Sequence, residues 1–466
     1  MDHGIGPELD GIDLGDERLN RRSKVILEAL AASPQVSINA ACSGWNETLA
    51  AYRFFDNPAV EAEKILAPHQ VATKQRIQAQ PVVLIIQDTT ELDFTSHPPQ
   101  DAGCLNKPDR FGFYDHTYLA ITPERLCLGV VGDEQFERTP ESLGKTAERV
   151  NWPIEDKESF RWLTGYRVAS ELARECPDTQ IVSVADCEAD LYDIFVDAQE
   201  QEIPAEFVIR AKANRSIPEK DPTGGPAAYL KVQDEVRASK VRIRKTIELP
   251  QTPKREARTA TLEIRAMSVT IKPPHARSRL PQVTCNVVLV EEVHGPGDGT
   301  DLSWLLITTL PIKTIVEIEL IIDYYVARWM IEVYFRTLKT GCKVEEMQLE
   351  AVQRVKNCLA FYKIIAWRIL YLTHLNRECP DLPCDVVFDP DEWEAAWQVV
   401  KAEPPPKAPP SLGEFMKVVA ELGGYNNRPS EPPPGPQVIW MGLRRMIDFA
   451  LAWKAFQKQH PQLMYK

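Results

Sequence analysis

Four polar side chains recur at helical spacing in an otherwise apolar segment. They are Tyr325, Arg328, Glu332 and Lys339. Positions i, i+3, i+7 and i+14 place them along one stripe of a helix. The rest of the segment is too apolar for an exposed helix, so the stripe is not simply a solvated face. Two interpretations stay open: an internal stripe of salt bridges, or a functional site in which an acid and cations act together.

Two aspartates each follow an apolar run typical of a buried central strand. Asp88 comes just after residues 82–86, and Asp186 directly after residues 180–185. The carboxyl ends of such strands form the edge of an α/β sheet at which active sites are built, so both side chains are candidates for a catalytic site. Taken alone, either aspartate is more often the cap of a turn or helix, and that alternative also stays open.

The elements that would position these residues follow from the hydrophobic periodicity. Strand patterns at 82–86, 112–121, 126–131, 180–185 and 207–210, with a long helical pattern over 158–176, predict a mixed α/β core. Alternating stretches within residues 211–310 predict a β-rich insertion. Residues 314–340 then predict one long helix or a pair, and residues 352–377 predict another.

Both ends of the chain are predicted to be helical. Asp16 can cap a helix whose apolar side opposes a face bearing Arg18, Arg21 and Arg22, which could bind phosphate. At the other end, two proline clusters interrupt helical patterns at 412–422 and 442–453. We therefore expect a helical module over residues 1–70 and a small helical domain at the C-terminal end.

Composition limits the class of protein. The 466 residues are 44% hydrophobic and 26% charged, typical of folded soluble chains, and suffice for several domains. The net charge of −13 means that any contact with nucleic acid must be locally basic. The ten cysteines lack paired C-x-x-C spacing, which disfavours zinc ribbons and a disulfide framework. With neither a leader nor an apolar run of spanning length, a cytoplasmic protein is expected.

The spacing Y-x2-R-x3-E-x6-K, formed by the four residues of the stripe, resembles the signature of bacterial insertion-sequence DDE transposases, the family that includes the transposase of transposon five. The segments around Leu14–Arg18, Gln87–Thr90 and Asp186–Asp190 resemble other motifs of the family, as do Leu422–Gly424 and Trp440–Arg445. The resemblance covers nearly the whole chain in the family's order. Cys187 and Phe335 depart from the pattern, standing where the transposon-five enzyme has a basic residue and a histidine.

The resemblance implies a fold and an acidic triad. It implies an RNase H-like catalytic domain with the triad Asp88, Asp186 and Glu332, which would bind two Mg²⁺ ions, with Mn²⁺ able to substitute. Three converging carboxylates repel one another unless cations lie between them, and Mg²⁺ prefers such oxygen ligands. Two ions can activate the attacking oxygen of a phosphodiester cleavage and stabilise the leaving oxygen.

The resemblance also implies DNA contacts. Arg328 and Lys339 would hold phosphates, Tyr325 would position one, and Trp304 would stack a flipped base. Arg210 matches a DNA-contact arginine, and Arg18 and Arg22 resemble end-recognition residues. Without the resemblance, Trp304 is a strand-core aromatic and Arg210 a partner in a salt bridge. A run of basic residues between Lys240 and Arg258 is a candidate backbone-binding patch or a solvated face.

The domain order follows from the same resemblance. We expect a helical DNA-binding domain at 1–70, an RNase H-like catalytic domain at 71–372 with the β-rich insertion at about 211–310, and a C-terminal helical dimerisation domain at 373–466. The implied partners are double-stranded DNA, both transposon ends and target, and a second copy of the chain in the synaptic complex.

The implied function is cut-and-paste transposition in the bacterial cytoplasm at the nucleoid. Its expected route binds inverted repeats, hydrolyses one strand, passes through a DNA hairpin and joins the 3′-OH ends to target DNA. Two alternatives remain open. One is a metal-dependent nuclease without strand transfer, and the other is a catalytically silent or repurposed DNA-binding protein.

Overall fold

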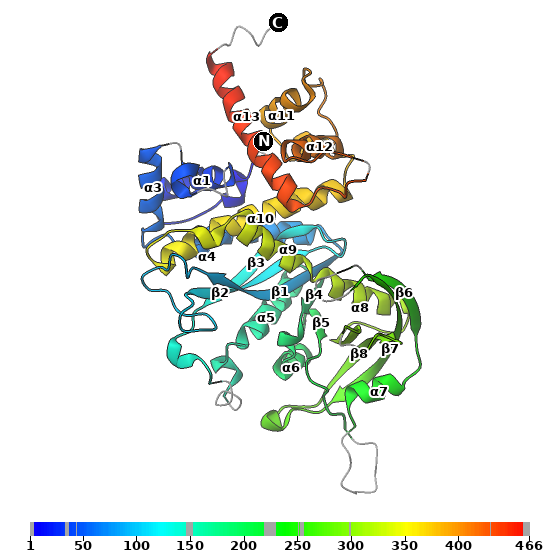
Figure 1. The fold of residues 1–466 in the computed structure, drawn as a ribbon. Coiled ribbons are helices and arrows are strands. Elements are labelled where there is room, and N and C mark those ends of the chain that lie inside the picture. The colour runs from blue at the N-terminus through cyan, green and yellow to red at the C-terminus, as the bar shows by residue number, and fades with distance from the viewer. Residues whose placement is uncertain are drawn as a thin grey trace, which may run out of the picture.

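The computed structural model describes residues 4–32, 37–42, 44–145, 152–218, 230–249, 251, 256–297, 300–428 and 430–459. These residues form one nine-stranded mixed sheet with helical regions at both ends of the chain (Figure 1). The strands are β1 Val82–Asp93, β2 Gly112–Ile121, β3 Cys127–Phe136, β4 Gln180–Ala185, β5 Glu206–Arg210, β6 Ile243–Leu249, β7 Arg258–Ile271, β8 Val283–Val293 and β9 Ser303–Thr308.

The sheet has the order β3-β2-β1-β4-β5-β9-β8-β7-β6. β1, β4 and β5 run parallel to one another, whereas β2 and β3 form antiparallel pairs on one side. This arrangement confirms the predicted α/β class and is that of an RNase H-like core.

β1 is buried on both faces, which explains its unbroken apolar run. Leu84 and Ile86 contribute to the hydrophobic core on one face of the sheet, while Val83 and Ile85 contribute to the core on the other. The helices α4 (Ala62–Gln78), α9 (Met330–Arg336) and α10 (Val352–Glu378) cover the first face, and α5 (Phe160–Glu175) and α6 (Tyr192–Glu200) cover the second (Figure 1).

The region predicted as a β-rich insertion contains β6 to β9 and the short helix α7 (Val232–Ala238). It continues the catalytic sheet, because β9 pairs with β5 through Ile209 opposite Ile307. Sequence patterns predict the strands but not this pairing, since it joins segments almost a hundred residues apart. The helix α8 (Ile315–Ala327) lies beside this half of the sheet (Figure 1).

The N-terminal region is helical, with α1 (Glu17–Ala32), α2 (Ile38–Ala41) and α3 (Trp45–Phe55) preceding α4. As predicted, α1 buries one apolar side, through residues such as Ile26, Leu27 and Leu30. The expected domain boundary at residue 70 falls inside α4, and the strand pattern begins only at Val82.

The C-terminal region packs α11 (Pro390–Lys401), α12 (Leu412–Leu422) and α13 (Pro436–Gln459) around a separate hydrophobic cluster. The expected boundary at residue 372 falls inside α10, whose last turns contribute Leu372 and Leu375 to that cluster. By length and composition α10 could cross a membrane, but 89% of its apolar window is buried inside the protein, as in a core helix.

Candidate active site

The two predicted aspartates lie on neighbouring strands. Asp186 directly follows β4, as predicted, whereas Asp88 lies within β1, because pairing with β2 extends that strand past its apolar run to Asp93. Ile86 of β1 is directly opposite Val184 of the parallel strand β4, and each aspartate follows two residues later. The backbone N–H of Thr89 donates a hydrogen bond to Asp88 Oδ1 over 2.8 Å. The backbone N–H of Glu188 donates to Asp186 Oδ1 over the same distance. Both carboxylates are therefore oriented by the chain that follows them.

Glu332 reaches this edge of the sheet from α9, and Arg328 connects it to Asp88. Arg328 Nη1 donates to Asp88 Oδ2 over 2.8 Å, and Nη2 donates to Glu332 Oε1 over 3.1 Å. The Arg328 side chain is only 13% exposed. One buried guanidinium thus holds two of the three acidic side chains that the sequence pointed to.

The three carboxylates also act on one another electrostatically. Burial raises the pKa of Asp88 to about 6, and the negative charges of Asp186 and Glu332 add to this rise against the opposing charge of Arg328. An elevated pKa of this kind is typical of functional sites, because it reflects like charges gathered where solvent is scarce.

The rest of the signature is divided between separate elements. Tyr325 is on α8, Arg328 follows its last residue, and Glu332 is on α9, so the predicted pair of helices is observed rather than one continuous helix. Lys339 lies in a π-helical turn over Thr337–Gly341. Its Nζ pairs with Glu345 over 3.2 Å. The i, i+7 and i+14 spacing assumes a regular α-helix, and the chain departs from that pitch from Thr337 on.

Trp304 and Arg210 extend the site along β9 and β5. The Trp304 ring meets Tyr325 edge to face at 5.5 Å between centroids. The Arg210 guanidinium contacts the Ser303 carbonyl over 3.4 Å. Burial raises the pKa of Tyr325, whereas the positive charges of Arg328 and Arg210 oppose that rise. These three aromatic and cationic side chains border the carboxylates.

Arg18 and Arg22 lie on α1 in the N-terminal region. The Arg18 side chain is 85% exposed and pairs with Asp16, its near neighbour. The predicted basic run is largely neutralised where it is described: Arg244 pairs with Glu263, Lys245 with Glu319, and Arg258 with Glu292. Two of its members, Lys254 and Arg255, lie outside the described residues.

A buried polar chain beneath Asp88 was not predicted. Arg161 donates to Thr89 Oγ1 over 2.9 Å, and that hydroxyl lies 2.8 Å from His116 Nδ1. His116 Nε2 faces the Gln87 amide oxygen at 3.2 Å, and the Gln87 amide donates to Ser183 on β4. Burial lowers the pKa of His116 well below its usual range, so the ring is neutral. No sequence signal marks this chain, because its members come from four separate elements.

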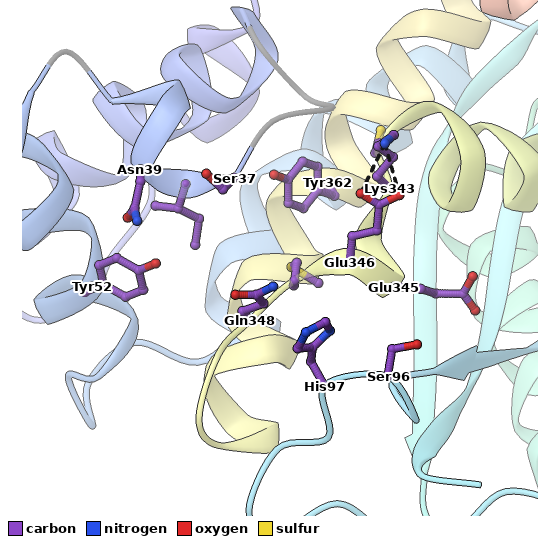
Figure 2. A pocket seen from close by; sticks show the side chains of 13 residues that line it. Ser37, Asn39, Tyr52, Ser96, His97, Lys343, Glu345, Glu346, Gln348 and Tyr362 are labelled. Carbon is purple, nitrogen blue, oxygen red and sulfur yellow. Dashed lines mark hydrogen bonds and ion pairs between the residues drawn. The ribbon is translucent and has the colours of Figure 1, made fainter.

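A cavity of about 730 Å³ lies between the N-terminal helices and the turn after Lys339 (Figure 2). Asn39, Tyr52, His97 and Gln348 are among the polar side chains that surround it. Glu345, another lining residue, connects it to the active-site region by accepting the backbone N–H of Asp93 over 3.0 Å. The cavity combines segments from four distant parts of the chain, so the sequence does not reveal it.

The acidic residues fit a hard divalent cation by their donor chemistry. All three offer carboxylate oxygens, and Asp88 and Glu332 already share one cationic group, Arg328. Within the described part of the chain, no group of three His, Cys, Asp or Glu side chains is assembled to hold a metal ion directly. The guanidinium of Arg328 occupies the position between two of the candidate ligands.

Comparisons with known proteins give matches in three parts of the chain. Residues 5–60 match the family model for transposase DNA-binding. Residues 166–368 match the transposase DDE domain, a range that contains Asp186 and Glu332 but not Asp88. Residues 364–457 match the transposase Tn5 dimerisation domain.

Among solved structures, the chain is similar to one described as the cryo-EM structure of a piggyBac transposase synaptic complex with hairpin DNA. The TM-score is 0.36 at 9% sequence identity, over 96% of this chain and 73% of that one, too distant a likeness to support a functional argument. The three family matches follow one another along most of the sequence. Because they occur together in one chain, the protein belongs to the Tn5-like DDE transposases, enzymes that act on DNA.

Proposed function

We propose that this transposase works by a cut-and-paste route in which Asp88, Asp186 and Glu332 form the catalytic triad. The observation that carries the proposal is the shared contact of Arg328 with Asp88 and Glu332, on the strand that neighbours the one Asp186 follows. Carboxylates from two strands and a helix meet there around one positive charge. Such a set is suited to holding the cations that phosphodiester chemistry needs.

The metal in this proposal is Mg²⁺, with Mn²⁺ as a substitute. Two such ions, when bound by the three carboxylates, would supply activation of the attacking oxygen and stabilisation of the leaving oxygen. Arg328 would then exchange its carboxylate contacts for a DNA phosphate, for which the forked guanidinium is well shaped. Lys339 and Tyr325 would hold neighbouring phosphates.

The proposed reaction on DNA has four steps at one site. Water hydrolyses the phosphodiester at the transposon end and frees a 3′-OH. That hydroxyl attacks a phosphodiester of the opposite strand and displaces the 3′-oxygen of the flanking DNA, which forms a hairpin. A second water hydrolyses the new bond of the hairpin and frees the 3′-OH again. The same 3′-OH then attacks a phosphodiester of the target DNA and displaces a 3′-oxygen of the target strand. A tight hairpin requires a base to leave the stack. Trp304, at the edge of the site beside Tyr325, offers an aromatic surface for that base.

The proposed assembly is a dimer on DNA, with each subunit binding one end and cutting the other. Residues 1–70, with Arg18 and Arg22, would recognise the inverted repeat. Residues 71–372 would carry the chemistry, with Arg210 as a further DNA contact, and residues 373–466 would join the subunits. The setting proposed is the bacterial cytoplasm, at the nucleoid.

The experiment that tests this proposal incubates the purified protein with Mg²⁺ and labelled DNA carrying the sequences that flank its gene. Products are resolved on a denaturing gel. Hairpin-ended fragments and joined products are expected, and they should be absent without the metal. Nicks alone would favour a nuclease without strand transfer, and binding without cleavage would favour a silent or repurposed DNA-binding protein.

A further inference from the structure

Arg161, near the start of α5, contacts a residue next to each of the two proposed catalytic aspartates. Its Nε donates to Thr89 Oγ1 over 2.9 Å, and its Nη2 contacts the Glu188 carboxylate over 3.1 Å. Thr89 follows Asp88 directly, and Glu188 is two residues after Asp186. One guanidinium thus links β1 to the turn that follows β4, beyond the last residue pair that these two strands share.

Each of these two partners also binds the aspartate beside it. The Thr89 N–H donates to Asp88 Oδ1, and the Glu188 N–H donates to Asp186 Oδ1. In both carboxylates this N–H holds Oδ1. The other oxygen of Asp88 accepts a hydrogen bond from Arg328. The rotamer of each aspartate therefore depends on a neighbouring residue that Arg161 contacts.

Arg161 itself is held on every side. Its side chain is 10% exposed, and its Nη1 donates to the Glu158 carbonyl over 2.6 Å. The guanidinium lies 5.2 Å from the centre of the Phe136 ring and 5.6 Å from that of Trp162. A buried, stacked arginine with three oxygen partners has little freedom to move, so it can set the separation of Thr89 and Glu188.

We propose that Arg161 is a positioning residue that holds Asp88 and Asp186 in the separation and rotamers that bind the divalent cation. The inference rests on the proposed triad and adds to it a residue outside the signature. Partners that orient metal ligands typically contribute 10–100-fold to metal affinity or activity. Arg161 would thus affect how the aspartates bind the cation, and not how the protein binds DNA.

The test measures Mn²⁺ binding to the DNA-free protein by electron paramagnetic resonance, alongside end binding without metal and single-turnover nicking. Arg161→Met is expected to weaken Mn²⁺ binding about 10-fold or more. Nicking should fall by a similar factor and recover in part at high Mn²⁺, with end binding unchanged. Arg161→Lys can make one contact but not both, so its values should lie between. Arg167→Met, on the same helix but paired at the surface with Asp197, should behave like wild type.

If Arg161→Met does not fold, Glu188→Gln still tests the inference. The Glu188 side chain is 57% exposed, so its replacement should leave the fold intact. It should weaken Mn²⁺ binding in the wild-type background. In a folded Arg161→Met background it should add little, since the two side chains act through one contact. Full additivity would instead make Glu188 a direct ligand and overturn the inference.

Asp88→Asn and Asp186→Asn separate this inference from the proposal beneath it. If they bind Mn²⁺ as wild type does, the triad itself is wrong. If they lose Mn²⁺ binding while Arg161→Met and Glu188→Gln retain it in full, the triad stands and the positioning role of Arg161 is refuted.

Discussion

Arg328 compensates charge at the centre of the site. Its two nitrogens satisfy one oxygen each of Asp88 and Glu332, so the carboxylates stay close despite their mutual repulsion. Arg328 already lies between the two carboxylates. A divalent cation would replace it there, and a DNA phosphate would then bind its guanidinium. In the proposed mechanism, Arg328 would therefore couple occupancy of the acidic site to its own release toward the DNA.

Glu332→Gln tests the acidic triad at the level of one side chain. The amide keeps the shape and the possible contact with Arg328 but removes the negative charge that a metal ligand needs. End binding should stay within about twofold of wild type, while nicking should fall by at least about 10³-fold. A gel-shift assay and a cleavage assay on the same DNA measure the two effects. Glu350→Gln, at an exposed pair with Arg354, is the matched control; rapid cleavage by Glu332→Gln would remove Glu332 from the triad.

Trp304→Ala tests the flipped-base role. Loss of base stacking typically costs about 1–3 kcal/mol, so hairpin formation should slow roughly 5–160-fold. First-strand nicking needs no extruded base and should change much less. Time courses that resolve nicked and hairpin DNA give both rates. Equal slowing of the two steps would assign Trp304 to packing against Tyr325 instead.

At the residue scale, the sequence predicts the identities in the site better than their contacts. Asp88 and Asp186 each follow an apolar run, and that pattern places them on neighbouring strands, although β1 itself continues to Asp93. Arg161 is not predicted, because its partner Thr89 is 72 positions away and no local spacing links the two. The pairing of Lys339 with Glu345 is not predicted either, because helical spacing does not reveal the π-helical turn that Lys339 occupies.

At the element scale, α10 is fixed to the catalytic sheet by a buried ion triplet. Lys363 Nζ lies 2.6 Å from Asp115 on β2 and 2.5 Å from Asp133 on β3, and the Lys363 side chain is fully buried. Burial alone lowers the pKa of Lys363, but the two carboxylates outweigh it and the net shift is upward. The ammonium is therefore charged and holds the helix to two strands at once.

Lys363→Met should destabilise the protein by about 3–5 kcal/mol, because two buried carboxylates lose their counter-charge. Urea unfolding at neutral pH measures the loss. Adding Asp115→Asn and Asp133→Asn should recover a large part of it. Lys356→Met, on the same helix but paired near the surface with Glu137, should cost only about 1 kcal/mol or less. Equal losses for the two lysine variants would contradict the role given to the buried triplet.

The sequence predicts the strands of the β-rich insertion but not their place in the sheet. Alternation along β7 and β8 reveals strands, since their burial also alternates. Which strand pairs with β5 is decided by chain geometry over about a hundred residues, and alternation carries no information about that. Local patterns therefore predicted the strands, and only the folded chain shows one sheet joining Arg210 and Trp304 to the catalytic edge.

At the scale of the whole molecule, Glu8 fastens the N-terminal region to the core. It contacts His69 Nδ1 at 2.5 Å and Arg76 Nη1 at 2.9 Å, both on α4. His69 Nε2 accepts the backbone N–H of Val130, so its Nδ1 carries the proton that faces Glu8. Burial by itself raises the pKa of Glu8, but His69 and Arg76 outweigh it and lower the pKa to about 2.

This network makes the protein sensitive to acid. Glu8 has a lowered pKa, so its contribution is complete above its ordinary value of 4.5 and is lost as the pH falls toward 2. Burial lowers the pKa of His69 too. Below about pH 6.5 the imidazole therefore binds a proton more readily in the unfolded chain, which also lowers the stability of the fold. The charged groups that face Glu8 and His69 are Arg76 and, at longer range, Arg368.

Glu8→Gln isolates the carboxylate's share of that effect. At pH 7 the variant should be less stable than wild type by up to about 3 kcal/mol, and the difference should shrink progressively below pH 4.5. Urea unfolding of both proteins between pH 7 and pH 3.5 measures it. Glu61→Gln, at an exposed pair with Lys64, should show no comparable gap. A gap for Glu8→Gln that is constant with pH would contradict a role for the Glu8 charge.

The continuity of α10 decides where this chain can be shortened. A fragment ending at residue 372 would stop within the helix and would lose Leu375 together with its partners in the hydrophobic cluster, such as Phe415. A fragment that keeps the whole of α10 would instead leave Leu372 and Leu375 exposed, because α11, α12 and α13 would be missing. Both truncations uncover apolar surface, so both are expected to be less soluble than the full chain. The exposed stretch 377–383, which begins in the last turn of α10, is therefore suited to a protease site rather than to a stop codon.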